Sequence, residues 1–131
     1  MNALSHPKPR RRVVLVDAAP VVLSAIESFL FLETDHEVIS FCCPHEALQY
    51  MASHPVDVVV ADLMLTDMDG VTFFDKVREL DQNVRMVMLS GCAEGGWRET
   101  MRARGLYGCL DKPWCNDELN ALIEGKDDDD E

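Results

Sequence analysis

Short apolar runs alternate along the chain with stretches in which apolar residues recur three and four positions apart. The apolar runs predict strands, and the first of them is continuous and β-branched, as in a strand buried on both faces. The periodic stretches predict helices. Pro20 suits the first turn of the first helix, Gly105 the end of the fourth, and Asn116 the cap of the last. The predicted strands lie at 13–16, 37–41, 57–61, 86–89 and 109–110, and the predicted helices at 20–32, 44–52, 71–80, 97–103 and 116–123.

Strands that alternate with helices in this way predict an α/β fold. The sheet should be parallel and covered on both faces, because each crossover helix must pack on the sheet that it connects. In open sheets of this kind, ligands bind beyond the carboxyl ends of the strands. We therefore expect the polar residues that follow four of the strands to meet at one edge of the sheet. They are Asp17, Asp62, Ser90 and Lys112.

Composition narrows the class of protein. At 131 residues with 47% hydrophobic content, the chain has room for one domain with its own core. Its longest apolar runs are far below the ~20 residues of a membrane helix, and no hydrophobic segment directly follows the basic start, so we expect a cytoplasmic protein without membrane binding. The formal charge of −12 argues against general attraction to nucleic acid. The five cysteines form no CxxC pair, which favours reduced thiols over disulfides or a zinc site.

Charge is concentrated at the two ends of the chain. Lys8 and the arginines at 10–12 form a basic arm, and residues 127–131 are all acidic. Runs of like charge are usually solvated and disordered. We expect a flexible basic arm over 1–11, a folded domain over 12–124 and a disordered acidic tail over 125–131. A domain excised from a longer protein would have the same ends.

The four converging side chains suit phosphoryl chemistry. A carboxylate such as that of Asp62 can attack phosphorus and form an aspartyl phosphate. The phosphoryl oxygens then need a cation and a donor, roles that suit the Lys112 ammonium and the Ser90 hydroxyl. Mg²⁺ would bridge carboxylates and phosphate, and Asp17 is placed to help hold it. Taken singly, each residue has a structural explanation as a cap, a strand end or a surface cation, but their joint placement favours a phosphoryl pocket.

Four motifs occur in the order VVLVDAAP, VVVADLMLTDMDG, VMLSG and LDKPW. Over about residues 12–124 they resemble the receiver domains of bacterial two-component response regulators, of the kind found in chemotaxis regulators. The resemblance implies a flavodoxin-like, doubly wound sheet of five parallel strands in the order 2-1-3-4-5, with five helices. It implies that Asp62 is the phosphoacceptor and that Ser90 and Lys112 contact the phosphoryl group. It also implies that Asp17, Asp62 and the main-chain carbonyl of Met64 hold Mg²⁺.

Some positions match the family pattern and others depart from it. The Asp69-Gly70 turn lies at the family's distance after the phosphoacceptor, and Pro113 follows the lysine, usually through a cis peptide. Receivers place two adjacent acids after the first strand, but the second is Ala18 here, which predicts weakened Mg²⁺ binding because an anionic ligand is lost. The family's switch aromatic, three positions before the lysine, is replaced by Cys109. Tyr107 should point to the same sheet face as Cys109 and is interpreted as a packing residue.

The resemblance implies a signalling switch. Asp62 would take a phosphoryl group from a sensor histidine kinase or a histidine phosphotransfer protein, and the new charge would shift an existing equilibrium in the face of the fourth and fifth helices. Output would come from a downstream protein, an appended domain or a homodimer, and catalysis would be limited to the domain's own phosphorylation and dephosphorylation. The alternative, given Ala18 and Cys109, is a pseudo-receiver that binds proteins independently of phosphorylation. A hydrolase would need a separate base and substrate pocket, for which the sequence offers no candidate.

Overall fold

The sheet has five parallel strands with helices between them. In the computed structural model, which describes residues 10–91 and 96–125, the strand order is β2-β1-β3-β4-β5. This is the flavodoxin-like order that the resemblance implied, and the predicted α/β fold is confirmed. The strands are Arg12–Val16 (β1), Glu37–Phe41 (β2), Val58–Asp62 (β3), Arg85–Ser90 (β4) and Gly108–Asp111 (β5).

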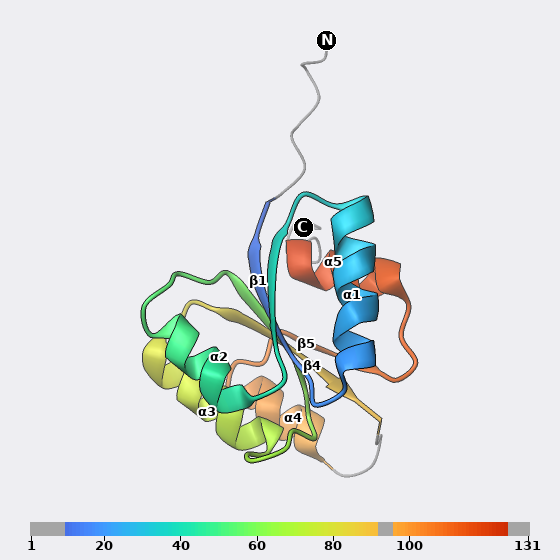
Figure 1. Ribbon diagram of the computed structural model, residues 1–131. Helices are drawn as coiled ribbons and strands as arrows, with labels where there is room; N and C mark the ends of the chain where they lie inside the picture. Colours follow the sequence, from blue (N-terminus) through green and yellow to red (C-terminus); the bar gives the residue numbers. More distant parts are fainter. Residues whose placement is uncertain (1–9, 92–95, 126–131) are drawn as a thin grey trace.

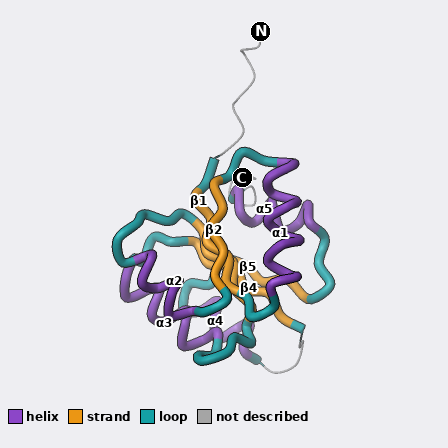
Figure 2. Tube along the Cα trace, in the orientation of Figure 1, coloured by secondary structure: helices purple, strands orange, loops and turns teal. Residues whose placement is uncertain are grey.

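Helices cover both faces of this sheet. Figure 1 shows α1 and α5 on one side and α2, α3 and α4 on the other, and Figure 2 shows the strands as the layer between them. Pro20 begins α1, and Gly105, with a left-handed φ of 109°, follows the end of α4, both as expected. No helix in the described ranges has the length and apolar character that a membrane span needs. The helices are Pro20–Glu33 (α1), Pro44–Met51 (α2), Gly70–Leu80 (α3), Trp97–Ala103 (α4) and Asn116–Glu124 (α5).

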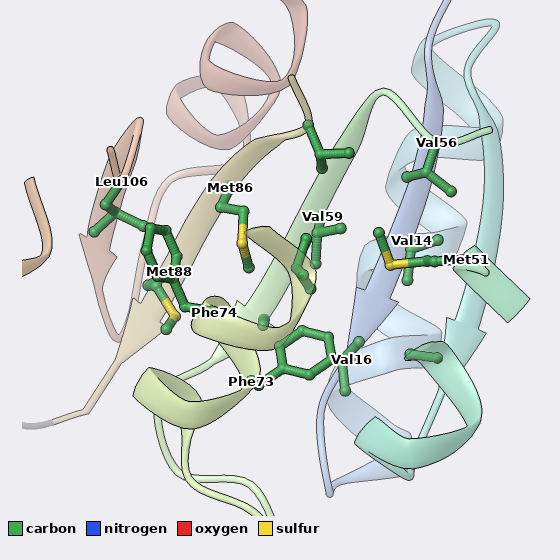
Figure 3. Close-up of a cluster of buried hydrophobic side chains, with 14 of the residues drawn as sticks. Val14, Val16, Met51, Val56, Val59, Phe73, Phe74, Met86, Met88 and Leu106 are labelled. Carbon is green, nitrogen blue, oxygen red and sulfur yellow. The ribbon is translucent and has the colours of Figure 1, made fainter. Parts of the chain in front are cut away.

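Each face of the sheet buries its own hydrophobic cluster. Successive residues of a strand point to opposite faces, so Val14 of β1 packs in the cluster beneath α2 and α3, whereas Val13 packs in the cluster beneath α1 and α5. Figure 3 shows the first cluster, where Phe73 and Phe74 of α3 lie among the strand side chains. Because β3 is buried on both faces, its sequence is apolar at every position before Asp62.

Three strands, β3, β4 and β5, extend one residue further toward the carboxyl edge than the hydrophobic pattern indicates. Asp62 is the last residue of β3, and Ser90 is the last residue of β4. The ladder reaches this far because it uses main-chain groups only: Asp62 is in register with Leu89, and the Leu63 N–H donates to the Leu89 carbonyl at 2.9 Å. The sheet itself therefore fixes the main chain at Asp62 and Ser90.

Two local expectations about helices are wrong. Asn116 is the first residue of α5 rather than its cap, and Cys115 holds the cap position without a side-chain hydrogen bond. The apolar spacing of Val71, Phe74, Val77 and Leu80 predicts one helical stripe over 71–80, but Leu80, the last residue of α3, is 45% exposed, whereas Val77 is fully buried. Phe73, which the stripe did not include, is fully buried.

Part of the predicted chain organisation lies outside the described residues. This holds for most of the basic arm over 1–11, for most of the acidic tail over 125–131 and for Cys92. The cysteines within the described ranges form no disulfide. Those ranges also contain no group of three His, Cys, Asp or Glu side chains that could hold a metal ion.

Candidate functional site

A buried carboxylate and an ammonium group meet at the carboxyl ends of β3 and β5. Asp62 is 6% exposed, and its Oδ2 accepts a hydrogen bond from Lys112 Nζ at 2.6 Å. Its Oδ1 accepts from the Met64 main-chain N–H at 2.9 Å. The Lys112 main-chain N–H donates to the Ser90 carbonyl at 2.8 Å, and the peptide between Lys112 and Pro113 is cis, as the resemblance implied. The short, charge-assisted hydrogen bond between Lys112 and Asp62 is therefore held by main-chain contacts at the ends of both β3 and β5.

Asp17 brings a second carboxylate to the same lysine. Its Oδ1 accepts from the Ala19 N–H at 2.8 Å, while its Oδ2 lies 3.9 Å from Lys112 Nζ and has no hydrogen-bond partner among the described residues. Burial raises the pKa of Asp17; the charge of Asp62 acts in the same direction, and the Ala19 N–H and Lys112 oppose it. Two carboxylates around one ammonium leave an excess of negative charge, which favours a further cation at this edge.

Ser90 and Met64, the other two expected site residues, contribute in different ways. The Ser90 side chain is buried at the end of β4, in register with Asp111 of β5, directly before Lys112. Met64 is 70% exposed, and its main chain reaches the pocket through the N–H that donates to Asp62 Oδ1. The structure thus brings Asp17 and Asp62 to one ammonium group and joins Ser90 to them through the main chain of Lys112.

The oxygen atoms at this edge suit a hard divalent cation, with one anionic ligand fewer than the family pattern. The carboxylates of Asp17 and Asp62 and the main-chain carbonyl of Met64 are oxygen donors, which Mg²⁺ prefers alongside several waters. The unpartnered Oδ2 of Asp17 is a buried acceptor of this kind. Ala18 is exposed and has only a methyl group at the position of the second acid. The donors therefore fit Mg²⁺ but do not fully enclose it.

The loop after Asp62 is held by a close approach of α3. The Gly70 N–H donates to the Leu63 carbonyl at 2.8 Å, and a Cβ on Gly70 would lie 2.8 Å from both the Cα and the carbonyl oxygen of Leu63. Asp69 caps α3, its Oδ1 accepting from the Thr72 N–H at 2.8 Å, and this hydrogen bond lowers the pKa of Asp69. The Asp69-Gly70 turn thus sets where the residues next to Asp62 lie.

The expected orientation of Tyr107 is wrong. Cys109 packs with the cluster beneath α3, whereas Tyr107 packs with the cluster on the opposite face of the sheet. The reason is that Tyr107 precedes β5, so the alternation of the strand does not extend to it. The Arg85 guanidinium lies 4.5 Å from the centre of its ring. Tyr107 is a packing residue, as interpreted, but on the other face from Cys109.

An ion pair beside the lysine was not expected from the sequence. Arg98, near the start of α4, pairs with Asp111 of β5, and its guanidinium lies 5.3 Å from the Trp97 ring centre. The two partners are 13 positions apart, across an irregular connection, so no helical or strand periodicity relates them. Only the sheet order, which brings β5 beside β4 and the start of α4, could have indicated the contact.

Comparison with known proteins identifies the domain type. One family model, described as "Response regulator receiver domain", matches residues 13–124. The response regulator Rre1 from Synechocystis sp. is 31% identical over 113 residues, which cover 85% of this chain and 49% of that protein. The chain spans about half the length of the first curated relatives that it matches.

Solved structures agree on the fold. A CheY-like response regulator receiver domain protein from Methanospirillum hungatei JF-1 superposes with a TM-score of 0.83 at 22% identity, covering 92% of this chain and 96% of that one. The receiver domain of the sensor histidine kinase PA1611 from Pseudomonas aeruginosa PAO1, solved with a magnesium ion coordinated in its active-site cleft, gives 0.78 at 23% identity. That match covers 89% of this chain and 97% of the other.

Proposed function

Because the chain belongs to the family of response regulator receiver domains, we propose that it is a phosphorylation-dependent signalling switch with Asp62 as its phosphoacceptor. The observation that carries this proposal is the contact of 2.6 Å between Lys112 Nζ and Asp62 Oδ2 in a pocket with Asp17. A buried carboxylate at the carboxyl edge of a doubly wound sheet, with a cation already beside it, has the position and the electrostatics of a phosphoryl acceptor.

The transfer uses the residues of the pocket in distinct roles. An oxygen of Asp62 attacks the phosphorus of a phosphohistidine on the partner protein; the new O–P bond forms as the N–P bond breaks, and the electron pair returns to the imidazole nitrogen. Lys112 compensates the charge of the phosphoryl oxygens, and the Ser90 hydroxyl donates to one of them. The donor is a sensor histidine kinase or a histidine phosphotransfer protein, and the domain catalyses nothing beyond its own phosphorylation and dephosphorylation.

Mg²⁺ would be held by Asp17, Asp62 and the main-chain carbonyl of Met64. When bound, it would neutralise charge on the phosphoryl oxygens during transfer. With Ala18 in place of the second acid, the site has lost one of the anionic ligands that such a cation uses, so its affinity is lower than in receivers with both acids. The unpartnered Oδ2 of Asp17 supports this assignment, because a bound cation would satisfy it.

A phosphorylation assay on the purified chain tests the proposal. With Mg²⁺ and a small phosphodonor, intact-mass spectrometry should detect one added phosphoryl group on the wild type and none on Asp62→Asn. Asp67→Asn is the matched control, because Asp67 is exposed in the same loop and the substitution removes the same charge. Its phosphorylation should equal that of the wild type. Phosphorylation of Asp62→Asn at the wild-type level would refute the assignment.

A second candidate function follows from Ala18 and Cys109. Without the second acid and without the switch aromatic, the domain could bind its partner independently of phosphorylation, as a pseudo-receiver. The two functions differ in one measurement: beryllium fluoride, a phosphoryl mimic, should change partner binding and the amide NMR spectrum of a switch but leave a pseudo-receiver unaffected. Identical behaviour of the wild type and Asp62→Asn with kinase and binding partner would favour the pseudo-receiver.

Several broader features belong to the same proposal. We place the domain at 12–124, between the basic segment at 1–11 and the acidic segment at 125–131, in the cytoplasm. Its output would pass to a downstream protein, an appended domain or a second copy of the chain. The charge of −12 makes nucleic acid an unfavourable direct ligand.

A further inference from the structure

A second buried polar cluster lies at the opposite end of the sheet from Asp62. The His36 side chain is fully buried, and that of Glu124 is 5% exposed. His36 directly precedes β2, and Glu124 is the last residue of α5, so the cluster joins the start of a strand to the end of a helix. In Figure 1 this end of α5 lies near the start of β1 and the connection from α1 to β2. The proposed phosphoacceptor function assigns no role to this cluster.

The hydrogen bonds in the cluster fix the tautomer of His36. Asn120 Nδ2 donates to Glu124 Oε2 at 2.9 Å, so the amide oxygen of Asn120 is the atom that faces the ring. This oxygen lies 3.1 Å from His36 Nε2, which must therefore carry the proton. His36 Nδ1 is then an unprotonated acceptor, and the Arg11 main-chain N–H donates to it at 3.0 Å. The neutral ring satisfies every one of these contacts.

A second proton on His36 has no place in this arrangement. It would have to bind Nδ1, where it would face the N–H of Arg11, and two donors cannot share a hydrogen bond. Arg11 is also tied to its neighbours: its carbonyl accepts from the Glu37 N–H at 2.9 Å, and its Nη2 donates to the Glu124 carbonyl at 2.7 Å. Displacing Arg11 from His36 would therefore disturb the attachment of β1, β2 and α5 to one another.

We propose that His36 is a proton-sensitive lock on the C-terminal end of α5. The neutral ring ties that end to the starts of β1 and β2, and proton uptake at Nδ1 releases it. The helix begins at Asn116, shortly after Lys112, so the lock holds the far end of the element that follows the candidate phosphoryl-binding lysine. Acidification would thus loosen α5 from the end opposite the phosphoacceptor.

Some groups around His36 raise its pKa and others lower it. Burial is the largest influence and lowers the pKa of His36; Arg11 acts in the same direction, whereas the Asn120 hydrogen bond, Glu124 and Asp35 raise it. On α1, Glu27 lines the same surface groove as His36. On β4, Arg85 reaches the end of α5, donating to the Ile123 carbonyl at 3.2 Å. Because burial dominates and lowers the pKa of His36, the ring is neutral at neutral pH.

Hydrogen exchange on the full chain tests the lock. After correction for the intrinsic pH dependence of exchange, amides at the end of α5 should exchange about tenfold faster at about pH 5.5 than at about pH 7.5, because protonated His36 favours local opening. Amides of β3 serve as the internal reference. His36→Asn should remove the acceleration, since its amide oxygen can still accept from Arg11 but does not titrate. His45→Gln and His54→Gln, at exposed positions, should retain it.

Two outcomes would overturn the proposal: equal corrected exchange of α5 at both pH values in the wild type, or the same acceleration in His36→Asn. A ¹⁵N NMR titration of the wild-type ring decides the matter if His36→Asn does not fold. It should find the Nε2–H tautomer at neutral pH and protonation of Nδ1 together with a shift of the Arg11 amide signal. A Nδ1–H tautomer at neutral pH, or a His36 titration that leaves the Arg11 amide unchanged, would contradict the lock.

Discussion

At the scale of single residues, Lys112 is the only cation placed on the two buried carboxylates of the pocket within the described ranges. Its Nζ lies 2.6 Å from Asp62 Oδ2 and 3.9 Å from Asp17 Oδ2. Both carboxylates also accept one main-chain N–H each, from Met64 and Ala19. A bound cation would satisfy the unpartnered Oδ2 of Asp17. Ala18, the next residue along the chain, has no oxygen with which to add a further ligand.

Ala18→Asp should tighten Mg²⁺ binding by about tenfold or more, because it restores a hard anionic ligand beside Asp17. Without Mg²⁺, the third carboxylate should lower the free energy of unfolding through repulsion of its neighbours. Isothermal titration calorimetry with MgCl₂ measures the affinity directly. Ala25→Asp adds the same charge on the exposed side of α1 and should leave the affinity unchanged. An unchanged affinity in Ala18→Asp would mean that its side chain does not reach the cation.

The pocket residues could be predicted because they depend on topology alone. Asp17, Asp62 and Lys112 follow apolar runs, and parallel strands bring their carboxyl ends to one edge whatever the details of packing. The contacts of His36 with Asn120 could not be predicted in this way. These residues are 84 positions apart, and their meeting depends on how α5 lies across the sheet, which no local periodicity specifies.

At the scale of elements, the start of α3 holds the loop that follows Asp62, the proposed phosphoacceptor. Gly70→Ala should lower the free energy of unfolding by about 1–3 kcal/mol, since the new methyl group would overlap the main chain of Leu63, which cannot move without shifting β3. The gain in helix propensity, up to about 1 kcal/mol, is smaller than this cost. Phosphorylation of Asp62 should also slow, because Leu63 lies between Asp62 and Met64. Urea unfolding and the mass assay measure the two effects.

Gly96→Ala is the matched control for this substitution. Gly96 precedes α4, and within the described part of the chain a Cβ at this position would meet no atom within 4 Å beyond its chain neighbours. Its effect on the free energy of unfolding should stay within about 0.5 kcal/mol. Equal destabilisation by Gly70→Ala and Gly96→Ala would show that the close approach to Leu63 is not the cause.

The cap of α3 makes a separate contribution. Asp69→Ala should cost about 1 kcal/mol of unfolding free energy, because the Thr72 N–H loses its acceptor at the helix start. Asp69→Asn should cost much less, since asparagine caps helices about as well as aspartate. Thermal or urea unfolding of the two variants separates the loss of the hydrogen bond from the loss of charge. A large loss in Asp69→Asn would assign the effect to charge instead.

Periodicity predicted the elements more reliably than their ends. The run at 37–41 coincides with β2, because the polar segment at 33–36 precedes it and Pro44 begins the next helix. The ends of β3 and β4 were missed by one residue because Asp62 and Ser90 are polar yet still pair through the main chain. Asn116 was predicted as a cap because asparagine is common at that position, but a residue of this type can also occupy the first turn, as it does in α5.

At the scale of the whole molecule, the domain has two polar centres at opposite ends of one sheet. The pocket of Asp62 and Lys112 lies at the carboxyl ends of the strands, and the cluster of His36 and Glu124 lies at their amino ends. Between the two centres, β3 carries no ionisable side chain before Asp62. Mild acidification should therefore act on stability through the His36 cluster, at the end of the sheet away from Asp62.

We expect His36 to lower the free energy of unfolding at mildly acidic pH. Its pKa in the folded state is lowered from the ordinary value of 6.5 that it regains on unfolding, so the unfolded chain takes up the proton first as pH falls. The contribution of neutral His36 to stability is thus fully present above about pH 6.5 and is lost as pH falls below it, until the folded-state pKa is reached. Urea unfolding from about pH 7.5 to about pH 5.5 should follow this decline in the wild type. His36→Asn should give a flatter profile over the same range, and a decline as steep as that of the wild type would assign the acid sensitivity to other groups.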